Sequence, residues 1–385
     1  MNEPLSRRHS PSHKTLVVVG EQPPETLKTL RQASAGAEIP TEMVARPEDL
    51  PACLAAHDPL AVIVRMAGKG GLEACVDVRG RSSLSHVPIL GLSRDCSDLD
   101  FTELFSTGGD DLVNEDVAQP LLRRLRSLLT SPARPLDEAR SKGRAVVVGP
   151  DPVWRTMMRR ALVNAGLEVD VKENGRAAVD ASADARFVVA SDDLDAGGAI
   201  AWVSEARDAG NKVPWVIVAP PKRMGAVRAA AKVIERAAVA DAFAPTENVL
   251  FVANDLIRSG GTDNRKSARM LYGTTVAFRV AGRDSDEVGF TYNISAGGLY
   301  VRTLAAPEQG QEVWLELWPP RSERRVRLAG KVAWRRPFGA NETATVPAGF
   351  GLELTDGLSG DLERWSLGYE AYAHSLTGER GTKAS

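Results

Sequence analysis

The sequence predicts two consecutive doubly wound α/β domains, each with about five parallel strands, followed by a small antiparallel β-barrel or sandwich. The length of 385 residues allows two to four domains, at roughly 100–200 residues per domain. Similar short apolar runs occur in the first and second thirds of the chain and alternate with helical patterns. The last third instead alternates polar and apolar residues, with turn signals about every 8–12 residues.

Two polar stretches divide the chain. Residues 131–143 contain prolines and charged side chains, and residues 259–264 have the sequence Ser-Gly-Gly-Thr-Asp-Asn. Both compositions are typical of linkers. We therefore expect α/β domains at 14–130 and 144–258, a β-domain at 265–376, and disordered tails at 1–13 and 377–385.

The two α/β domains are predicted by an internal repeat. The motif Val-Val-Val-Gly-x-x-Pro begins at Val17 and again at Val146. A Val-Pro pair followed by two apolar residues begins at Val87 and again at Val213. Continuous apolar runs of this length fit strands that are buried on both faces of a parallel sheet.

The β-domain is predicted by alternation with a period of two. Val326, Leu328, Val332 and Trp334 are expected to face the core, which makes Trp334 a core aromatic. A short helix around Asp361–Ser375 is expected to close the domain. The basic side chains between the apolar ones are expected to face outward: Arg325, Arg327, Lys331 and Arg335. This outward face is either solvated or assists in binding a ligand.

Composition excludes several classes of function. Lys and Arg number 48 and Asp and Glu 50, a net charge of −2, which excludes a generally basic nucleic-acid binder. No surface aromatics are recognisable among the basic residues, which also argues against nucleic acid. The 3 cysteines have neither zinc nor redox spacing, so we expect a reducing compartment and no metal. Without a signal peptide or an apolar run of about 18 residues, the sequence predicts a cytoplasmic protein without a membrane span.

The repeated α/β domains resemble the CheY-like receiver domain of response regulators, in residues 62–73 and in Gly-Gly-Asp-Asp-Leu-Val at 108–113. Phosphoryl transfer in that family needs an acceptor aspartate, an acidic pair for Mg²⁺, a Ser or Thr, and a Lys. In the first domain the resemblance places Ile63 at the acceptor position and Glu115 at the lysine position, although Ser93 is retained. Isoleucine cannot be phosphorylated, so this domain is expected to be inert.

The second domain is similarly degenerate. Its acceptor position lies near Ser191, and Asp192 and Asp193 follow directly. Ala219 and Ala244 stand near the Ser/Thr and Lys positions. Asp192 is a candidate phosphoacceptor, and the alternative is a solvated, helix-capping loop. We expect both domains to serve docking, dimerisation or spacing.

The β-domain carries the most informative motifs. Arg265-Lys-Ser-Ala-Arg269 opens it, and Asn293-Ile-Ser-Ala-Gly-Gly follows in a strand-rich stretch. Together these motifs, RxxxR and [DN]xSxxG, resemble the PilZ domain, a β-barrel receptor for cyclic di-GMP. The glycine-opened segments 330–334 and 349–353 add to the resemblance.

The chemistry of these residues suits such a ligand. An arginine fork, as at Arg265 and Arg269, binds phosphate or guanine and stacks on purines. Asn293 and Ser295 share one strand face and would hydrogen-bond the ligand. Gly298 would permit a positive φ or a close backbone approach. The alternatives are a solvated basic linker for the arginines and an ordinary β-turn for Asn293 to Gly298.

The sequence therefore predicts a non-enzymatic effector. It would bind cyclic di-GMP, need no cofactor, and signal to an unidentified protein partner through interdomain rearrangement. A homodimer through the receiver-like domains is one arrangement that this function allows. No Walker loop, metal cluster or nucleophile elbow is present in the sequence. Two alternatives remain: a phosphorylation-controlled response regulator with a PilZ output domain, and an adaptor that no longer binds nucleotide.

Overall fold

The computed structural model describes residues 14–67, 70–81, 84, 87–130, 143–195, 197–243, 246–258, 269–338 and 347–377. The N-terminal tail and the second linker of the prediction lie outside these residues, as do all but one residue each of the first linker and the C-terminal tail. None of the helices in the described ranges combines the length and the hydropathy that crossing a bilayer requires.

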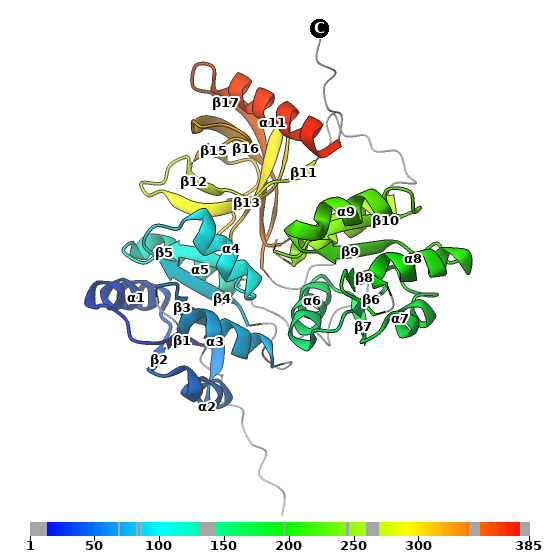
Figure 1. Cartoon of the computed structure of the whole chain (residues 1–385). Helices are drawn as coiled ribbons and strands as arrows, with labels where there is room; N and C mark the ends of the chain where they lie inside the picture. Colours follow the sequence, from blue (N-terminus) through cyan, green and yellow to red (C-terminus); the bar gives the residue numbers. More distant parts are fainter. Residues whose placement is uncertain are drawn as a thin grey trace, which may run out of the picture.

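The first unit, residues 14–130, is a parallel sheet covered by helices on both faces (Figure 1). Its strand order is β2-β1-β3-β4-β5, the doubly wound order of CheY-type folds. The strands are β1 (Lys14–Val19), β2 (Thr41–Val44), β3 (Asp58–Arg65), β4 (Ile89–Ser93) and β5 (Asp111–Asn114). The helices are α1 (Pro24–Ala37), α2 (Leu50–Ala56), α3 (Gly70–Arg79), α4 (Asp98–Ser106) and α5 (Ala118–Thr130).

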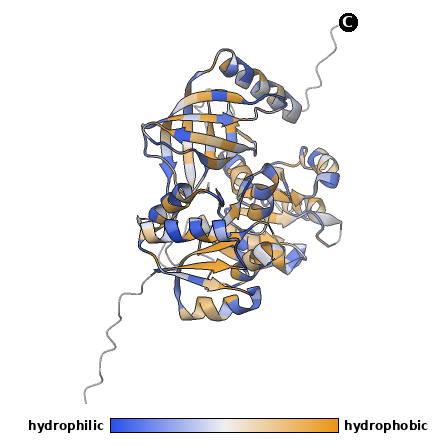
Figure 2. Ribbon diagram, turned by 90° about the vertical axis from the view of Figure 1, so that its left-hand side faces the viewer, coloured by the Kyte–Doolittle hydropathy of each residue, from blue (hydrophilic) through white to orange (hydrophobic). Residues whose placement is uncertain are grey.

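The second unit, residues 143–258, repeats this architecture, with the same strand order read as β7-β6-β8-β9-β10. Its central strands are almost entirely apolar, as are those of the first unit (Figure 2), because helices cover both faces of the sheet. The strands are β6 (Arg144–Val148), β7 (Glu168–Lys172), β8 (Phe187–Ser191), β9 (Trp215–Ala219) and β10 (Ala237–Asp241). The helices are α6 (Pro152–Asn164), α7 (Gly175–Ala181), α8 (Gly198–Asp208), α9 (Pro221–Ala231) and α10 (Glu247–Arg258).

The third unit is an antiparallel barrel. Its strands follow the order β13-β12-β15-β16-β17-β14, and the β13–β14 pairing closes the ring. The short strand β11 adds to β13, and Trp365 on α11 is fully buried against the barrel core. The elements are β11 (Met270–Leu271), β12 (Thr275–Val280), β13 (Glu287–Ser295), β14 (Gly298–Arg302), β15 (Glu312–Leu317), β16 (Val326–Arg336), β17 (Gly349–Gly357) and α11 (Asp361–Thr377). The predicted fold class is thus confirmed for all three parts of the chain.

The barrel packs mainly on the first unit and makes a smaller contact with the second unit, its neighbour in sequence (Figure 1). Phe290 of β13 joins the hydrophobic core of the first unit and stacks on Phe101 of α4, with ring centroids 5.1 Å apart. The second unit contacts the barrel through Phe251 of α10, whose ring lies edge-on to that of Tyr292, 6.0 Å between centroids. It contacts the first unit through Arg160, which donates to the carbonyl of Gly108 over 2.6 Å.

Candidate functional site

The candidate nucleotide site lies on the outer face of the barrel, where β11, β13 and β14 run side by side. Asn293 of β13 pairs with Leu271 of β11 on one side and with Tyr300 of β14 on the other. Ile294 is fully buried in the barrel core, so the flanking Asn293 and Ser295 side chains point away from the core, as alternation along a strand requires.

The second arginine of the RxxxR motif lies beside this strand. Leu271 pairs with Asn293 and Met270 with Ile294, in antiparallel register. One further step along this register brings Arg269, which is exposed, opposite Ser295. The structure therefore brings the end of the first motif next to the start of the second. Arg265 lies outside the described residues.

The side chain of Asn293 is available to a ligand. The residue is only 6% exposed, yet no hydrogen bond joins its side-chain amide to any of the described residues. An amide carries two donor hydrogens and an acceptor oxygen, and polar groups in such surroundings normally have partners. The Asn293 amide can therefore supply both donor and acceptor to a guanine edge or a phosphate.

Ser295 has a partly structural role. Its hydroxyl donates to the carbonyl of Gly298 over 3.2 Å, and its own carbonyl accepts from the indole of Trp365 over 3.2 Å. These bonds hold the β13–β14 turn and connect it to α11. The hydroxyl oxygen keeps its acceptor capacity, so Ser295 can still accept a hydrogen bond from a ligand.

The conformation of Gly298 serves the barrel itself. Its φ is not positive, so of the two predicted alternatives only the close backbone approach remains. A Cβ at Gly298 would lie 2.4 Å from the carbonyl oxygen of Leu352, on the paired strand β17. The close backbone approach that requires glycine is therefore an approach between β14 and β17.

Trp334 is not a core aromatic, and this prediction is wrong. The register between β16 and β17 shifts between Val332 and Trp334, and a β-bulge of this kind turns the next side chain to the other face. The half-buried Trp334 ring stacks on Tyr300, with centroids 4.9 Å apart. Gly351 leaves room for it, because a Cβ there would lie 2.3 Å from the indole nitrogen.

Tyr300 is a site residue that the sequence motifs did not indicate. It pairs with Asn293, stacks on Trp334, and donates its hydroxyl to the carbonyl of Pro347 over 2.6 Å. Burial raises the pKa of Tyr300, and the nearby charges of Arg336 and Arg302 partly oppose this. An amide without a partner among the described residues, a stacked aromatic pair and arginine cations thus adjoin one another, which suits a purine nucleotide.

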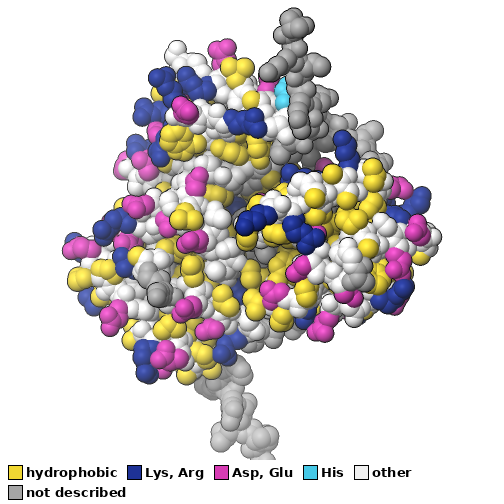
Figure 3. Space-filling model, viewed as in Figure 1, with side chains coloured by type: hydrophobic (Ala, Val, Ile, Leu, Met, Phe, Trp, Pro, Cys, Tyr) yellow, Lys and Arg dark blue, Asp and Glu magenta, His cyan; other side chains and the backbone are white. Residues whose placement is uncertain are grey.

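On the opposite side of the barrel, the expectation that no surface aromatics lie among the basic residues is wrong. Trp314 and Trp318, on and after β15, are 49% and 38% exposed, so aromatic side chains do lie among the basic ones. Figure 3 shows hydrophobic side chains next to Lys and Arg side chains on the visible face of the barrel. The guanidinium of Arg325 lies 5.4 Å from the centre of the Trp318 ring. Arg325 and Arg327 both form ion pairs with Glu316, and the hydrogen bond from Arg327 is the main cause that lowers the pKa of Glu316. Arg327 lies on β16 and Arg325 directly precedes it, and in the barrel order two strands separate β16 from β13, the strand of Asn293, in either direction.

In the first unit, the residues at the positions of the phosphoryl-transfer groups are buried or already bonded to other side chains. Ile63 is fully buried in the core. Ser93 donates to the carboxylate of Asp100 over 2.7 Å. Glu115, at the lysine position, is buried and accepts two hydrogen bonds from Arg65, at 2.6 and 3.0 Å. A carboxylate neutralised by arginine thus stands where the family has its lysine.

In the second unit, Asp192 follows directly after β8 and is 3% exposed. One of its carboxylate oxygens lies 3.0 Å from Nε of Arg223. Burial raises the pKa of Asp192, and Arg223 partly opposes this. Asp151, the nearest acid to the pair position, caps α6 by accepting from the amide of Val153. Within the described ranges, no group of three acidic, His or Cys side chains is arranged to hold a metal ion.

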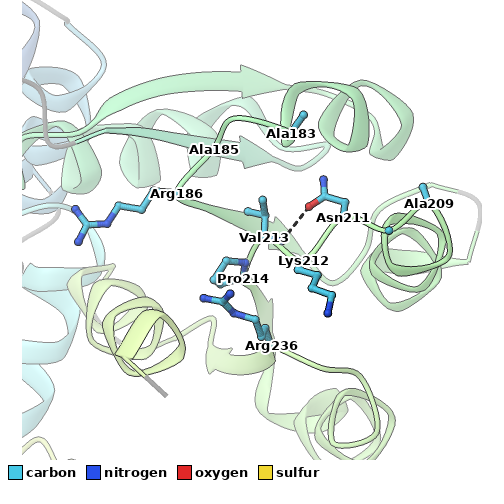
Figure 4. A pocket seen from close by; sticks show the side chains of 10 residues that line it. Ala183, Ala185, Arg186, Ala209, Asn211, Lys212, Val213, Pro214 and Arg236 are labelled. Carbon is cyan, nitrogen blue, oxygen red and sulfur yellow. Dashed lines mark hydrogen bonds between the residues drawn. The ribbon is translucent and has the colours of Figure 1, made fainter. Parts of the chain in front are cut away.

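The second unit also has a surface hollow of about 510 Å³ around the start of β9. It contains three basic residues, Arg186, Lys212 and Arg236, but Figure 4 shows the side chains of Arg186 and Lys212 pointing in different directions. Asn211 within it is already engaged, since it donates to Ser182 and accepts from the amide of Val213. The hollow therefore lacks convergent groups for a ligand.

Comparisons with known proteins bear on the barrel first. Residues 263–368 match the model of the PilZ domain family. No curated protein sequence matches the chain significantly. Among solved structures, the inhibitor of motility of Bacillus subtilis aligns at 20% identity and a TM-score of 0.25, over 31% of this chain and 55% of that one, so this chain spans about half of its length.

Two further solved structures belong to response regulators. One is a proposed two-component system response regulator/GGDEF domain protein, aligned over 64% of this chain and 100% of that one, at 15% identity and a TM-score of 0.30. The other is the chemotaxis response regulator CheY4 of Vibrio cholerae, aligned over 30% and 98%, at 17% identity and a TM-score of 0.27. Strand order, and not these low scores, identifies the fold of the first and second units.

Proposed function

We propose that this protein is a cyclic di-GMP effector without enzymatic activity, because residues 263–368 match the PilZ domain family. PilZ domains are nucleotide-binding and non-catalytic. The proposal rests chiefly on the position of Asn293, which lies on the same strand face as Ser295, the residue that the register places opposite Arg269. The side-chain amide of Asn293 has no hydrogen-bond partner among the described residues. Because cyclic di-GMP acts inside the cell, the proposal implies a cytoplasmic protein.

Each site residue has a distinct role in this proposal. Arg265 and Arg269 bind the phosphates or the guanine edges, since a guanidinium suits both. Asn293 and Ser295 hydrogen-bond the nucleotide from β13, and Gly298 keeps β14 close enough to β17 for this surface to form. The Trp334 ring offers a guanine a stacking surface, which for bases is worth about 1–3 kcal/mol each.

We further propose that the second unit moves when the nucleotide binds. The barrel packs into the core of the first unit, whereas the second unit meets it through Phe251 and Tyr292, next to Asn293. The RxxxR motif follows α10 of the second unit after the predicted linker, so arginines drawn onto the ligand would pull on that helix. The signal passes to a protein partner through surface that this movement exposes or covers.

A homodimer through the receiver-like units remains part of the proposal, with one restriction. The barrel already covers the side of the first unit formed by α4, β5 and α5. A second copy would therefore have to use other faces of the first unit, or the second unit.

Calorimetric titration of cyclic di-GMP into the full-length protein tests the binding. We expect saturable binding, and its loss in Arg269→Ala and in Asn293→Ala. Arg325→Ala is the matched control, because this arginine lies across the barrel on an exposed ion pair and should leave affinity unchanged. A folded protein that does not bind would support the adaptor alternative instead.

Small-angle scattering and limited proteolysis with and without cyclic di-GMP test the movement. We expect the scattering profile and the cleavage pattern of the linkers on either side of the second unit to change on binding. Tight binding that leaves both unchanged would contradict the proposed rearrangement and leave the receptor function standing.

A further inference from the structure

The first unit forms hydrogen bonds with the segment that connects Arg269 to strand β12. Asp98, the first residue of α4, accepts a hydrogen bond from the backbone amide of Thr275 over 2.6 Å. The hydroxyl of Thr274 lies 3.2 Å from its other carboxylate oxygen. Nearby, the hydroxyl of Thr275 donates to the carbonyl of Cys96 over 3.3 Å. The β4–α4 loop and the first residue of α4 thus hold the start of β12.

These contacts continue toward Asn293 through Thr291. The hydroxyl of Thr291 accepts from the amide of Thr274 over 2.8 Å and donates to the carbonyl of Tyr272 over 2.6 Å. The Thr291 amide in turn donates to the carbonyl of Thr274 over 2.9 Å. Thr274 and Thr291 are both buried. The whole connection between β11 and β12 is therefore fixed against β13 at a short distance from the site.

We propose that Asp98 is a positioning residue for the nucleotide site, so that the first unit is a structural part of the receptor. Asp98 fixes one end of the segment from Arg269 to Thr275, and the pairing of Leu271 with Asn293 fixes the other. A fixed segment lowers the ordering cost that Arg269 pays when it binds. This inference rests on the proposed function for its effect on affinity, but not for its effect on the segment itself.

The position of Asp98 is itself held by a well-packed interface. Phe101 and Phe105 of the same helix lie against Phe290, with ring centroids 5.1 and 5.7 Å away. The guanidinium of Arg302 lies over the Phe105 ring, 3.5 Å from its centre. Helix α4 therefore cannot withdraw from the barrel without exposing these rings, and Asp98 remains in place against Thr275.

The test compares Asp98→Ala with Asp98→Asn in the full-length protein. The alanine variant loses both acceptors, and we expect cyclic di-GMP affinity to fall about tenfold, the effect of one charge-assisted hydrogen bond. The asparagine variant keeps one acceptor oxygen for the Thr275 amide and should recover most of the affinity. Asp116→Ala is the control, because Asp116 lies in the same unit on a partly exposed ion pair with Arg94.

Hydrogen exchange without nucleotide separates this inference from the proposed function. In Asp98→Ala we expect faster exchange of the amides from Leu271 to Thr275 and unchanged exchange elsewhere in the barrel. This result would support the positioning role even if the wild-type protein did not bind cyclic di-GMP, in which case only the proposed function would fail. Unchanged exchange, or wild-type affinity in a nucleotide-binding protein, would overturn the inference.

A more conservative variant tests whether the effect of Asp98→Ala comes from a general loss of folding. Thr274→Val removes the hydroxyl that meets Asp98 and preserves the shape of the side chain. We expect a smaller loss of affinity than in Asp98→Ala, at an unchanged melting temperature. Equal losses in Thr274→Val and in the Asp116→Ala control would show a general loss of stability and would overturn the positioning role.

Discussion

Arg124 of the first unit and Glu287 of the barrel lie 163 residues apart in the chain and form a salt bridge in which neither side chain is exposed. Arg124 also pairs with Asp111 of its own unit over 3.0 Å and donates to the barrel carbonyl of Val288 over 2.7 Å. Burial lowers the pKa of Arg124, but Asp111 and Glu287 together raise it. The two units thus share one network of buried charges.

Breaking this network should destabilise both units together. In Glu287→Ala, Arg124 loses a partner and Arg123 loses its contact with the same carboxylate, so we expect a loss of about 3–5 kcal/mol. Urea unfolding measures this loss of stability, with hydrogen exchange followed separately for the amides of the barrel and of the first unit. The neighbouring Asp286→Ala, which removes an exposed pair with Arg279, should cost less than about 1 kcal/mol. Similar losses in both variants would contradict the role of the buried network.

Nucleotide affinity should depend on the outer-face tryptophan. Trp334→Ala removes the ring that stacks on Tyr300, and we expect cyclic di-GMP affinity to fall by about 5- to 150-fold, from a stacking term of about 1–3 kcal/mol. Gly351→Ala should act in the same direction, because the new methyl group displaces the indole. Titration calorimetry measures both. Trp314→Ala, on the opposite side of the barrel, is the control and should bind as the wild type does.

Substitutions of two residues of the second motif, Gly298 and Ser295, should have different effects on stability and affinity. Gly298→Ala places a methyl group against the carbonyl of Leu352 and should lower the melting temperature of the barrel. Ser295→Ala removes one hydroxyl and its bond to the Gly298 carbonyl, and should lower affinity with a smaller change in melting temperature than Gly298→Ala causes. Thermal unfolding and titration of the same samples test this. A Gly298→Ala barrel as stable as the wild type would show that the glycine is needed for the ligand instead.

Phosphoryl analogues should leave the second unit unchanged. Asp192 is paired with Arg223, and the nearest acid of the pair position, Asp151, is engaged as a helix cap. We expect beryllofluoride with Mg²⁺ to produce no change in scattering or in hydrogen exchange. A change that disappears in Asp192→Ala would revive the phosphorylation-controlled alternative. Asp193→Ala is the matched control for the loop itself.

Thiol reactivity should follow burial. Burial raises the pKa of Cys75 to about 11 and that of Cys96 to about 12. Since the thiolate is the reactive form, we expect a disulfide reagent at pH 8 to modify the half-buried Cys53 first and the other two only on unfolding. Folding favours the protonated thiols, so their contribution to stability should be lost as pH rises above about 8.5. Rapid modification of Cys96 in the folded protein would contradict the closed packing around it.

The fold was predictable from the sequence because its signals are local. Apolar runs and their repeat predicted both parallel sheets, and alternation predicted the barrel. The motifs also predicted that Asn293 and Ser295 share a face, since Ile294 between them is apolar and buried.

The wrong predictions concern residues where a bulge interrupts the local sequence pattern, or where the partner of a residue lies in another unit. The bulge after Val332 reverses the facing of Trp334, and a shift of one residue is invisible in the sequence pattern. Glu287 has the appearance of an ordinary outward-facing polar residue on a strand. Only Arg124, from another unit, makes its burial possible, and no periodicity in the sequence indicates such a partner.

The distance in sequence between Arg124 and Glu287 also fixes an order of events during synthesis. At about 5–20 residues per second, Glu287 leaves the ribosome roughly 8 to 33 seconds after Arg124. Until then the first unit has to fold with its barrel-facing side uncovered. Asp111, which pairs with Arg124 from within the same unit, is available from the start. The first unit therefore supplies a counter-ion for Arg124 from its own chain, Asp111, before the barrel has been synthesised.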